Sequence, residues 1–366
     1  MKLTKYKLGE ILDVTRGSSL SGEFYATEGK YIRLTCGNFD YQNNCFKENK
    51  SKDNLYYVGD FKPEFLMEEG DIITPLTEQA IGLLGSTAII PESGKYIQSQ
   101  DVAKIICKEE LLDKDFAFYL ISSTLVKQQL SAAAQQTKIR HTSPDKIRDC
   151  TVWIPELTEQ KRIGKLLRSL DCKIELNRAI NQNLEAMAKQ LYDYWFVQFD
   201  FPNEEGKPYK SSGGEMVWND RLKREIPEEW RATTIGEVEN NIITGKTPSC
   251  ADEDNFGGDI PFITIDDIRG NLFVFNSQRT LSTKGAESQT KKYLPSGSLS
   301  VSCIGTIGVM GFIAKLSQTN QQINSIVFEN EHNREFVYFA LKLYFENAKA
   351  KTGNVFANMS KDEFAS

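Results

Sequence analysis

Residues 157–195 form the stretch that most constrains how this chain can fold, because they contain no proline and only one glycine, Gly164, near the start. Apolar side chains recur along the stretch in steps of three and four, which is typical of one face of an α-helix. That face consists of Ile163, Leu167, Leu170, Ile174, Ile180, Leu184, Met187, Leu191 and Tyr194. At 1.5 Å per residue such a helix would be roughly 57 Å long. The sequence therefore predicts a rod with one apolar stripe.

A rod of this length cannot bury its stripe against itself, so the stripe indicates a second helix beside it, as in a coiled coil. Asn177 and Asn181 occupy stripe positions between the two apolar halves. Buried asparagines at such positions typically fix the register and the choice of partner at some cost in stability. The simpler alternative is a surface helix of an ordinary domain, but the length and the sustained stripe argue against it.

The composition is that of a globular protein, and 366 residues suffice for two or three domains with separate cores. No apolar run is long enough to span a membrane, and the N-terminal residues lack the apolar core of a secretion signal. The seven cysteines are odd in number and none is spaced CxxC, which favours a reduced, cytoplasmic protein over a zinc site or a disulfide framework. The net charge of −6 argues against a simple nucleic-acid binder, for which a basic excess is usual.

The first block, residues 1–155, is predicted to be an α+β domain, because strands come first and a helix follows. A polar turn is expected at Thr77–Gln79, between two strands. Helical spacing over 115–134 predicts the helix, with Asp115 as its cap. Alternating β-branched and aromatic residues predict strands within 30–36, 70–91 and 102–107.

After the rod, assigned to 156–198, residues 199–227 are rich in glycine, proline, serine and charge, which predicts a linker or an extended crossing segment. The last block, 228–366, repeats the first. The matching segments, in order, are 7–19 with 234–249, 30–39 with 260–268, 70–90 with 296–314, 115–130 with 334–351, and 136–147 with 353–364. Their shared order indicates an internal duplication of a domain of about 150 residues. No second rod follows the second copy in this sequence, so we expect the partner helix to come from another chain.

With these two divergent domains and the rod between them, the chain resembles the specificity subunit of type I restriction–modification systems. The segments that carry the resemblance are IPELTEQKRIGKLLRSLDCKIELNRAINQNLEAMAKQLYDYWF at 154–196 and IPEEWRATTIGEV at 226–238. The rod motif is specific, whereas the globular domains match only at the repeated framework segments. The resemblance implies two similar target-recognition domains, each with a twisted, mostly antiparallel sheet plus helices.

The resemblance further implies that each domain recognises one half of a split site in double-stranded DNA. The helix would set the spacing and dock modification subunits, which bind S-adenosylmethionine and methylate adenine, while separate restriction subunits cut DNA. The specificity subunit itself would have no catalytic centre and no cofactor. The family pairs two helical regions, and this sequence holds one of them.

The residues themselves offer little chemistry. His141 and His332 are the only histidines, and their separation disfavours a zinc site or an acid–base dyad. A Cys303–His332 pair is conceivable, but nothing in the sequence fixes its geometry. The glycine pairs Gly82–Gly85 and Gly305–Gly308 lie in apolar runs and favour tight strand turns over phosphate cradles. No catalytic or metal-binding residue is therefore assigned.

Candidate DNA contacts in the first domain are side chains that can hold phosphates or base edges. From Lys127 to Arg148 there are five Lys or Arg residues, Lys146 among them, against the single acid Asp145, a local charge of +4. A basic helix end that stabilises its own dipole is the alternative, but it does not account for the glutamines. The candidates are Arg16, Ser18, Thr77, Gln79, Gln135, Gln136, Lys138 and Arg140.

The repeat transfers the same positions to the second domain, where positive charge is sparser. The candidates there are Lys246, Thr247, Thr306, Asn320, Gln321, Gln322, Lys351 and Asn354. Recognition domains differ in the bases that they contact, so these residues follow from side-chain chemistry and not from the resemblance.

The exposed stripe leaves three possible occupants: a second copy of this chain, a separate short chain, or a modification subunit. An alternative function from another class is a scaffold whose two duplicated domains bind proteins, which the acidic charge favours modestly. A hydrolase or nuclease is disfavoured, because no acid–base or metal constellation is recognisable.

Overall fold

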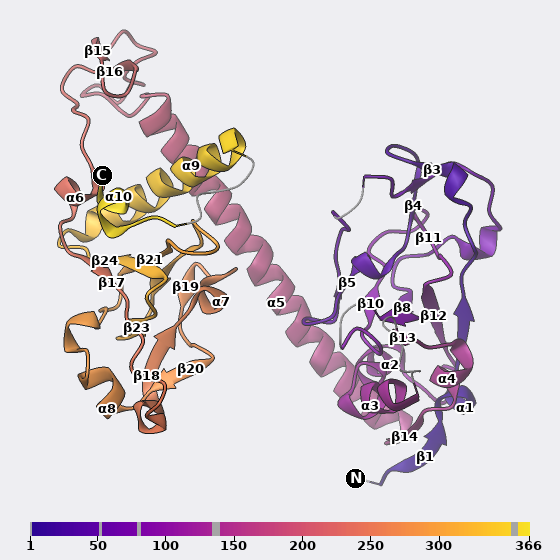
Figure 1. Ribbon diagram of the computed structural model, residues 1–366. Coiled ribbons are helices and arrows are strands. Elements are labelled where there is room, and N and C mark those ends of the chain that lie inside the picture. Colours follow the sequence, from indigo (N-terminus) through magenta and orange to yellow (C-terminus); the bar gives the residue numbers. More distant parts are fainter. Residues whose placement is uncertain (1, 51–52, 79–81, 134–139, 353–357) are drawn as a thin grey trace. The chain divides into compact units, whose positions relative to one another are not determined.

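The computed structural model describes residues 2–50, 53–78, 82–133, 140–352 and 358–366 (Figure 1). The chain divides into two compact units, Met1–Ile180 (unit 1) and Asn181–Ser366 (unit 2). Each unit combines sheets with helices, so the predicted α+β class is confirmed. Over the described ranges, the structure contains no helix with the length and apolar character needed to cross a membrane.

Unit 1 is built on an antiparallel sheet of order β10-β8-β12-β2 and a second sheet of order β11-β4-β7-β3, in which β11 is parallel to β4. Ile11, Val14, Ile105 and Leu130 are buried between the first sheet and the helices. The elements before the long helix are β1 (Thr4–Lys7), α1 (Leu8–Ile11), β2 (Leu12–Arg16), β3 (Tyr25–Ala26), β4 (Tyr31–Arg33), β5 (Phe39–Asp40), β6 (Cys45–Phe46), β7 (Tyr56–Tyr57), β8 (Ile72–Pro75), β9 (Thr77–Glu78), β10 (Ala88–Ile89), β11 (Tyr96–Ile97), β12 (Val102–Cys107), α2 (Lys114–Ile121), α3 (Thr124–Ala133), β13 (Arg140–His141), α4 (Pro144–Arg148) and β14 (Thr151–Ile154).

The helix expected over 115–134 is wrong in two details. It is interrupted at Ser122–Ser123, where the Ser122 hydroxyl donates to the Phe118 carbonyl at 3.1 Å and competes with the helical backbone. Its cap is Asp113, whose carboxylate accepts from the Phe116 N–H at 3.0 Å, and not Asp115. Both aspartates precede the same apolar run, so spacing alone could not separate them.

Unit 2 is built on a sheet of order β17-β24-β21-β22-β19 and a second sheet of order β20-β18-β23. Its main core packs Leu299, Val301, Leu341 and Phe345 between the first sheet and α9. The elements after the long helix are β15 (Met216–Asn219), β16 (Arg224–Pro227), α6 (Ile235–Val238), β17 (Ile242–Thr244), β18 (Phe256–Ile263), α7 (Ile265–Ile268), β19 (Phe273–Val274), β20 (Arg279–Leu281), α8 (Thr283–Glu287), β21 (Leu299–Ser302), β22 (Met310–Ile313), β23 (Gln318–Thr319), β24 (Ile323–Ile326), α9 (Arg334–Thr352) and α10 (Lys361–Ala365).

The two units share one topology. The order β2-β12-β8-β10 in unit 1 matches β17-β24-β21-β22 in unit 2, and β4 with its parallel neighbour β11 matches β18 with β23. Short helices close both copies in the same way, because Ser143 caps α4 and Ser360 caps α10 through their side chains. The sequence repeat therefore marks a duplicated fold, as predicted.

The segment 199–227, expected to be a linker, folds instead. Asp200 accepts hydrogen bonds from the N–H and the hydroxyl of Ser211, both at 2.7 Å. Phe201 stacks between Tyr209 and Trp230, and β15 pairs with β16 as a hairpin. Its glycine, proline, serine and charge content predicted a linker, but its aromatic side chains supply a small core of their own.

The long helix α5 (Leu157–Tyr192) continues as a π-helical turn through Asp193–Val197 (Figure 1). Its start is fixed to unit 1 by Gln160, whose amide accepts from the Asp113 N–H and donates to the Leu111 carbonyl. Gly164 is required because an added Cβ would lie 2.7 Å from the Phe116 nitrogen. The one glycine of the rod thus allows α5 to approach the start of α2.

Candidate nucleic-acid interface

The candidate turns of unit 1 lie at one end of its antiparallel sheet β10-β8-β12-β2. Ala103, near the start of β12, pairs with Arg16 at the end of β2 and with Thr74 near the end of β8. β9 follows β8 directly and pairs with β13, so that Thr77 lies opposite His141. Strand pairing therefore brings together the opening turn, the turn after β8 and the segment that leads into α4.

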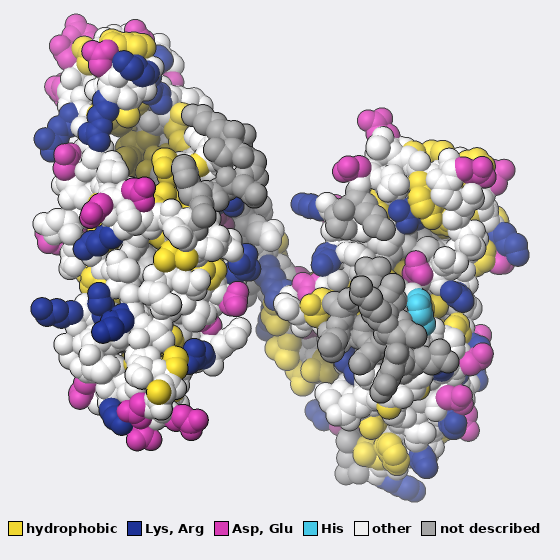
Figure 2. All heavy atoms as spheres, viewed as in Figure 1, with side chains coloured by type: hydrophobic (Ala, Val, Ile, Leu, Met, Phe, Trp, Pro, Cys, Tyr) yellow, Lys and Arg dark blue, Asp and Glu magenta, His cyan; other side chains and the backbone are white. Residues whose placement is uncertain are grey.

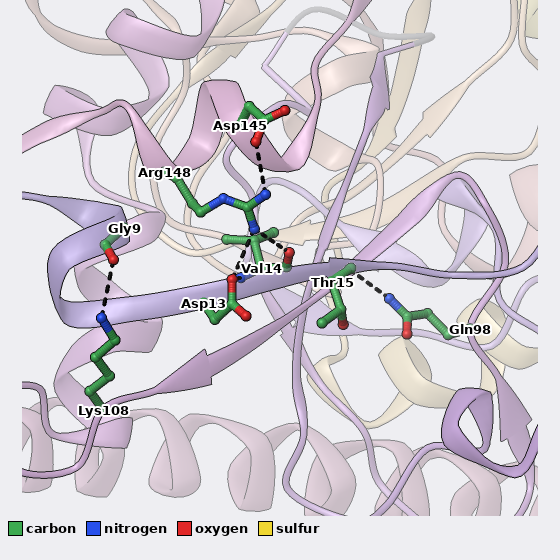
Figure 3. Close-up of polar contacts among 8 residues, drawn as sticks. All are labelled: Gly9, Asp13, Val14, Thr15, Gln98, Lys108, Asp145 and Arg148. Carbon is green, nitrogen blue, oxygen red and sulfur yellow. Dashed lines mark hydrogen bonds and ion pairs between the residues drawn. The ribbon is translucent and has the colours of Figure 1, made fainter.

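The opening turn of unit 1 is held by the loop before β12. The Ser18 N–H donates to the Gln98 carbonyl at 3.1 Å, and a Cβ on Gly17 would lie 2.3 Å from the same oxygen. The buried Gln98 amide donates to the Thr15 carbonyl at 2.9 Å (Figure 3). Arg16 donates from Nε to the Gln100 carbonyl at 2.8 Å and is otherwise exposed. The turn thus presents one oriented guanidinium.

Unit 2 repeats this turn with other side chains. The Lys246 N–H donates to the Thr319 carbonyl at 2.9 Å, and a Cβ on Gly245 would lie 2.1 Å from the Asn320 carbonyl oxygen. The Thr247 hydroxyl donates to the Gln321 side-chain oxygen at 2.7 Å. Lys246 and Gln321 are exposed, so the turn and the amide run form one surface.

The amides of this surface lie beside the glycine hairpin. The Asn320 amide donates to the Gln322 side-chain oxygen at 3.0 Å, and the Gln322 nitrogen is the nearest atom, at 3.8 Å, to a Cβ built on Gly305. Thr306 is exposed between Gly305 and Gly308, whose φ angles are +79° and +81°. These angles belong to tight glycine turns, as the sequence predicted.

Both glycine hairpins pack against the following helices. Gly85, with φ of +78°, lies under Lys127 of α3, and Gly308 lies under Phe345 of α9. Burial lowers the pKa of the Lys127 amino group. Lys127 is therefore partly a packing residue, because its side-chain stem lies against Gly85.

Arg148 also serves the fold rather than the surface. Its Nη1 donates to the Asp13 carboxylate at 2.9 Å and to the Val14 carbonyl at 2.7 Å, and its Nη2 donates to Asp145 at 2.8 Å (Figure 3). Lys146 donates to the Ala133 carbonyl at 2.8 Å. The local charge of +4 inferred from sequence thus overstates the free positive charge, because Arg148 ties α4 to β2.

Several predicted residues cannot be placed. Gln79, Gln135, Gln136, Lys138 and Asn354 lie outside the described residues, and the side chains of Arg140 and Lys351 are not described either.

Thr77 is placed but buried. Only 9% of the residue is exposed, and its hydroxyl lies 2.8 Å from the Cys36 sulfur. The Thr77 hydroxyl is therefore directed to the interior and not to a ligand.

The structure adds two lysines that the sequence did not single out. Lys291 and Lys292 end the short helix Thr290–Lys292, which follows the buried Gln289. Gln289 donates to the Lys246 carbonyl at 2.7 Å, so this segment lies directly against the opening turn. Two adjacent lysines are a basic signal in the sequence, but they lie outside the repeated segments from which most of the candidate contacts were chosen.

Positive charge is not concentrated over the visible surface. Figure 2 shows Lys and Arg side chains interspersed with Asp and Glu over both units. Within the described ranges, no group of three or more His, Cys, Asp and Glu side chains is placed to hold a metal ion. Burial raises the pKa of the Cys303 thiol to about 11, which keeps this cysteine protonated and a poor nucleophile at neutral pH.

The stripe of α5 is largely open to solvent. Ile163 and Leu167 are half-buried near unit 1, whereas Asn177 and Asn181 are exposed, as are the larger apolar residues beyond Leu167. Those exposed apolar residues are Leu170, Ile174, Ile180, Leu184, Met187, Leu191 and Tyr194.

A separate line of the helix binds its own units. Asp171 accepts from the Tyr119 hydroxyl at 2.6 Å, and Arg178 donates to Asn43 at 2.8 Å, both in unit 1. In unit 2, Glu185 forms an ion pair with Lys342, and Tyr192 stacks on Phe339. Burial raises the pKa of Tyr192 to about 12, as expected for a hydroxyl in an aromatic cluster.

Comparison with known proteins assigns this arrangement to a class. The family model described as type I restriction modification DNA specificity domain matches residues 2–186 and 227–366, once over each repeat. The chain therefore belongs to the type I restriction–modification DNA specificity family.

Two relatives illustrate the relationship. The type I restriction enzyme HindI specificity subunit of Haemophilus influenzae is 31% identical over 296 residues, which are 68% of this chain and 63% of that protein. The EcoBI specificity subunit of Escherichia coli is 23% identical over 269 residues, which cover 72% of this chain and 54% of the relative. The matched region thus spans less than two thirds of each relative's length.

The fold also matches a solved structure. The S subunit of a type I restriction–modification system from M. genitalium superposes with a TM-score of 0.59 at 16% identity, covering 100% of this chain and 83% of that one. At this identity the match concerns the fold, and it agrees with two α+β units connected by a long helix.

Proposed function

We propose that this chain is the sequence-recognition subunit of a type I restriction–modification complex, acting in the cytoplasm, in which each unit recognises one half of a split site in double-stranded DNA. The observation that carries the proposal is a surface present in both units, at the end of the main sheet where β2 in unit 1 and β17 in unit 2 finish. Gly17 with Ser18 in unit 1 and Gly245 with Lys246 in unit 2 form the same backbone turn against the loop before the matching strand. Family membership supplies DNA as the ligand.

The contacts divide by chemistry. Arg16, Lys246, Lys291 and Lys292 are cations suited to phosphate oxygens, which position a protein on the duplex without reading its sequence. Thr306, Asn320, Gln321 and Gln322 carry donor and acceptor pairs suited to base edges. Ser18 and Thr247 lie within the turns themselves and would contribute short-range contacts.

The proposed contacts of unit 1 also include basic and amide side chains that precede α4 in the sequence. Gln135, Gln136, Lys138 and Arg140 follow α3 in sequence, and β13 returns beside β9 at the same sheet end. If Lys138 and Arg140 each hold a phosphate, replacing both by alanine flattens the salt dependence of binding. The slope is expected to change by roughly 0.9 for each phosphate that the variant no longer holds.

Partner subunits account for the acidic charge. Modification subunits that hold S-adenosylmethionine and transfer the methyl group, with restriction subunits added to the complex, would share the grip on DNA. The net charge of −6 and the interspersed surface charges support weak DNA binding by the isolated chain. The helix α5 would set the spacing between half-sites and dock these subunits.

A protein-binding scaffold is the alternative. Binding of mixed-sequence duplex DNA, measured with and without a modification subunit, separates the two functions. We expect weak binding by the chain alone and tight, sequence-dependent binding by the complex. A complex that binds no better than the modification subunit alone would contradict the proposal, and tight specific binding by the isolated chain would contradict the division of labour.

A further inference from the structure

One buried glutamine, Gln289, joins two parts of the proposed DNA surface of unit 2. Its side-chain Nε2 donates to the Lys246 carbonyl in the opening turn at 2.7 Å. Its own backbone carbonyl accepts from the Lys292 N–H at 2.9 Å, at the end of the short helix Thr290–Lys292. The opening turn and the lysine pair, Lys291 with Lys292, are therefore held in one arrangement through a single residue.

A second buried glutamine, Gln318, holds the side chain of Gln289. The Gln289 Nε2 also donates to the Gln318 side-chain oxygen at 2.7 Å, and the Gln318 amide donates to the Ala286 carbonyl at 2.9 Å. Gln318 is completely buried and pairs in register with the buried Phe262. The amide pair therefore lies beside a small apolar core, where protein groups and not water must satisfy both side chains.

This amide pair is not the most stable arrangement for a buried site. The Gln289 side-chain oxygen is buried and has no hydrogen-bond partner within the described residues, and the same holds for the Thr319 hydroxyl. A Cβ on Gly245 would lie 2.3 Å from that hydroxyl, so Thr319 lies against the opening turn as well. A buried polar atom without a partner costs stability, whereas an apolar pair of the same shape avoids this cost. Stability alone therefore does not explain the two glutamines.

Unit 1 shows that the shared frame folds with an apolar residue in place of Gln318. The opening turn donates to the Gln98 carbonyl in unit 1 and to the Thr319 carbonyl in unit 2. The residue before each of these carbonyls is the fully buried Ile97 in unit 1 and Gln318 in unit 2. The same position of the fold therefore accepts an isoleucine.

The position of Gln289 differs between the units as well. The helix Thr290–Lys292 corresponds to Pro63–Phe65, because the N–H two residues after each helix donates to the carbonyl just before Gln318 or its counterpart, at 2.8 and 2.9 Å. The residue that precedes the helix is the buried Gln289 in unit 2 and the exposed Lys62 in unit 1. The two glutamines thus belong to unit 2 and not to the shared frame.

We propose that Gln289 is a positioning residue for DNA recognition by unit 2, and that its pairing with Gln318 serves the placement of the opening turn and not stability. Gln289 holds Lys246 relative to Lys291 and Lys292, so that the three cations meet the phosphates of one half-site together. Phosphate contacts set the register in which other side chains reach the base edges. This inference rests on the proposed function, because it concerns how the same surface is oriented.

Urea denaturation tests the first part of the proposal without DNA. Replacing both glutamines by methionine, Q289M/Q318M, keeps their length and removes the buried unpaired oxygen, while the carbonyl of the exposed Lys246 can accept from water. The midpoint of the double variant should equal or exceed that of the wild-type chain. Q318M alone should lower the midpoint, because one N–H of Gln289 then has no partner. A double variant that stays below the wild-type midpoint would show a structural role and overturn the proposal.

The salt dependence of DNA binding tests the positioning itself. The chain is assembled with a modification subunit, and fluorescence anisotropy measures binding of a labelled duplex that carries the site mapped by its methylation. K246A should reduce the slope of log K against log salt by roughly 0.9 in the otherwise wild-type chain. In Q289M/Q318M the same substitution should change the slope by less than about half as much, because Lys246 is no longer held at its phosphate.

A matched lysine and the methylation motif complete the experiment. Lys284 pairs with Asp252 at 2.8 Å, and K284A should leave the slope unchanged in both backgrounds. The motif methylated with Q289M/Q318M should be relaxed in one half only.

The outcomes separate this inference from the proposed function. A wild-type complex that binds DNA without sequence preference would overturn the proposed function and this inference with it. Sequence-dependent binding by the wild-type complex, together with a full K246A effect in Q289M/Q318M or an equal effect of K284A, would overturn this inference alone. An unchanged methylation motif in the double variant would also overturn it alone.

Discussion

The two units share a backbone frame and differ in the side chains placed on it. In both units a glycine follows an edge strand of the main sheet, Gly17 after β2 and Gly245 after β17. The glycine lets the N–H of the next residue donate to a carbonyl of the loop before β12 or β24. On that frame unit 1 presents Arg16, whereas unit 2 presents Lys246 and a run of amides. A duplicated scaffold can therefore present two different surfaces, because the fold depends on the glycines and not on the exposed side chains.

Buried polar side chains lie near this frame in both units, and in unit 1 the Thr74 hydroxyl donates to the Ser86 carbonyl at 2.8 Å. Unit 2 buries a hydrogen-bonded pair of hydroxyls, Ser300 with Ser325, at 2.8 Å, and Thr244 donates to the buried Asn324 at 2.7 Å. Ser302 accepts from the Val309 N–H and so fixes the glycine hairpin that carries Thr306. Buried polar pairs of this kind fix one geometry when they are satisfied. Unit 2 thus orients its hairpin through polar contacts inside the sheet.

The largest expected effect tests the shared frame. Replacing Gly17 or Gly245 by alanine puts a Cβ 2.3 Å or 2.1 Å from a carbonyl oxygen, so each variant should lose about 1–3 kcal/mol in the free energy of unfolding. Urea denaturation measures the loss. Gly22→Ala is the control, because its Cβ would meet only Tyr25 at 3.9 Å. If Gly17→Ala and Gly245→Ala unfold like this control, the glycine frame is not a structural requirement.

The next effect compares how each unit holds α5. Gly164→Ala crowds the Phe116 nitrogen at 2.7 Å and should cost about 1–3 kcal/mol in unit 1. Glu185→Ala removes a partly exposed ion pair with Lys342 and should cost less than about 1 kcal/mol in unit 2. Urea unfolding ranks the two, with the exposed Gln182→Ala as the baseline. The reverse ranking would show that unit 2 depends more on the helix than its contacts indicate.

Salt dependence should separate the two units more subtly. In a complex with a modification subunit, Arg16→Ala and Lys246→Ala should each reduce the slope of log K against log salt by roughly 0.9, if each cation holds one phosphate. Fluorescence anisotropy of labelled duplex at several salt concentrations measures the slope. Lys207→Ala in the folded 199–227 segment is the matched control, since Lys207 pairs with Glu205. A slope change in the control equal to that of the two variants would mean that the charges act non-specifically.

Cysteine reactivity gives the smallest and simplest comparison. Cys172 in unit 1 and Cys250 in unit 2 are exposed and should be alkylated first. Cys150 and Cys303 are buried, and burial raises the pKa of each thiol to about 11, so both should react only after unfolding. Mass spectrometry along a urea gradient then reports each unit separately. Early labelling of Cys303 in the native protein would contradict the packing described for unit 2.

The sequence predicted the duplicated domain and the long helix because both depend on residue patterns within short segments. The repeated segments predicted the duplicated domain, and the three-and-four spacing predicted α5. They failed at the cap of α2, where two aspartates precede the same apolar run, and at Arg148, whose partner is distant in sequence. Asp113 rather than Asp115 caps α2, and Arg148 is bound by Asp13 rather than free.

The candidate site was predictable only in part for the same reason. Lys291 and Lys292 join the surface through Gln289, which no spacing rule connects to Lys246. Thr77 has the right chemistry and position in sequence, yet the fold buries it against Cys36. Exposure and neighbours, which depend on tertiary packing, decide which polar residues are available to a ligand.

The central claim, that each unit recognises one half of a split site, is tested most directly by mapping adenine methylation across a genome in cells that express this chain with a cognate modification subunit. We predict a two-part motif for the wild-type chain, and for Gln322→Ala a motif relaxed in one half only, with discrimination of about 1–3 kcal/mol lost at that base pair. A continuous motif, or a Gln322→Ala motif altered in both halves, would contradict the account.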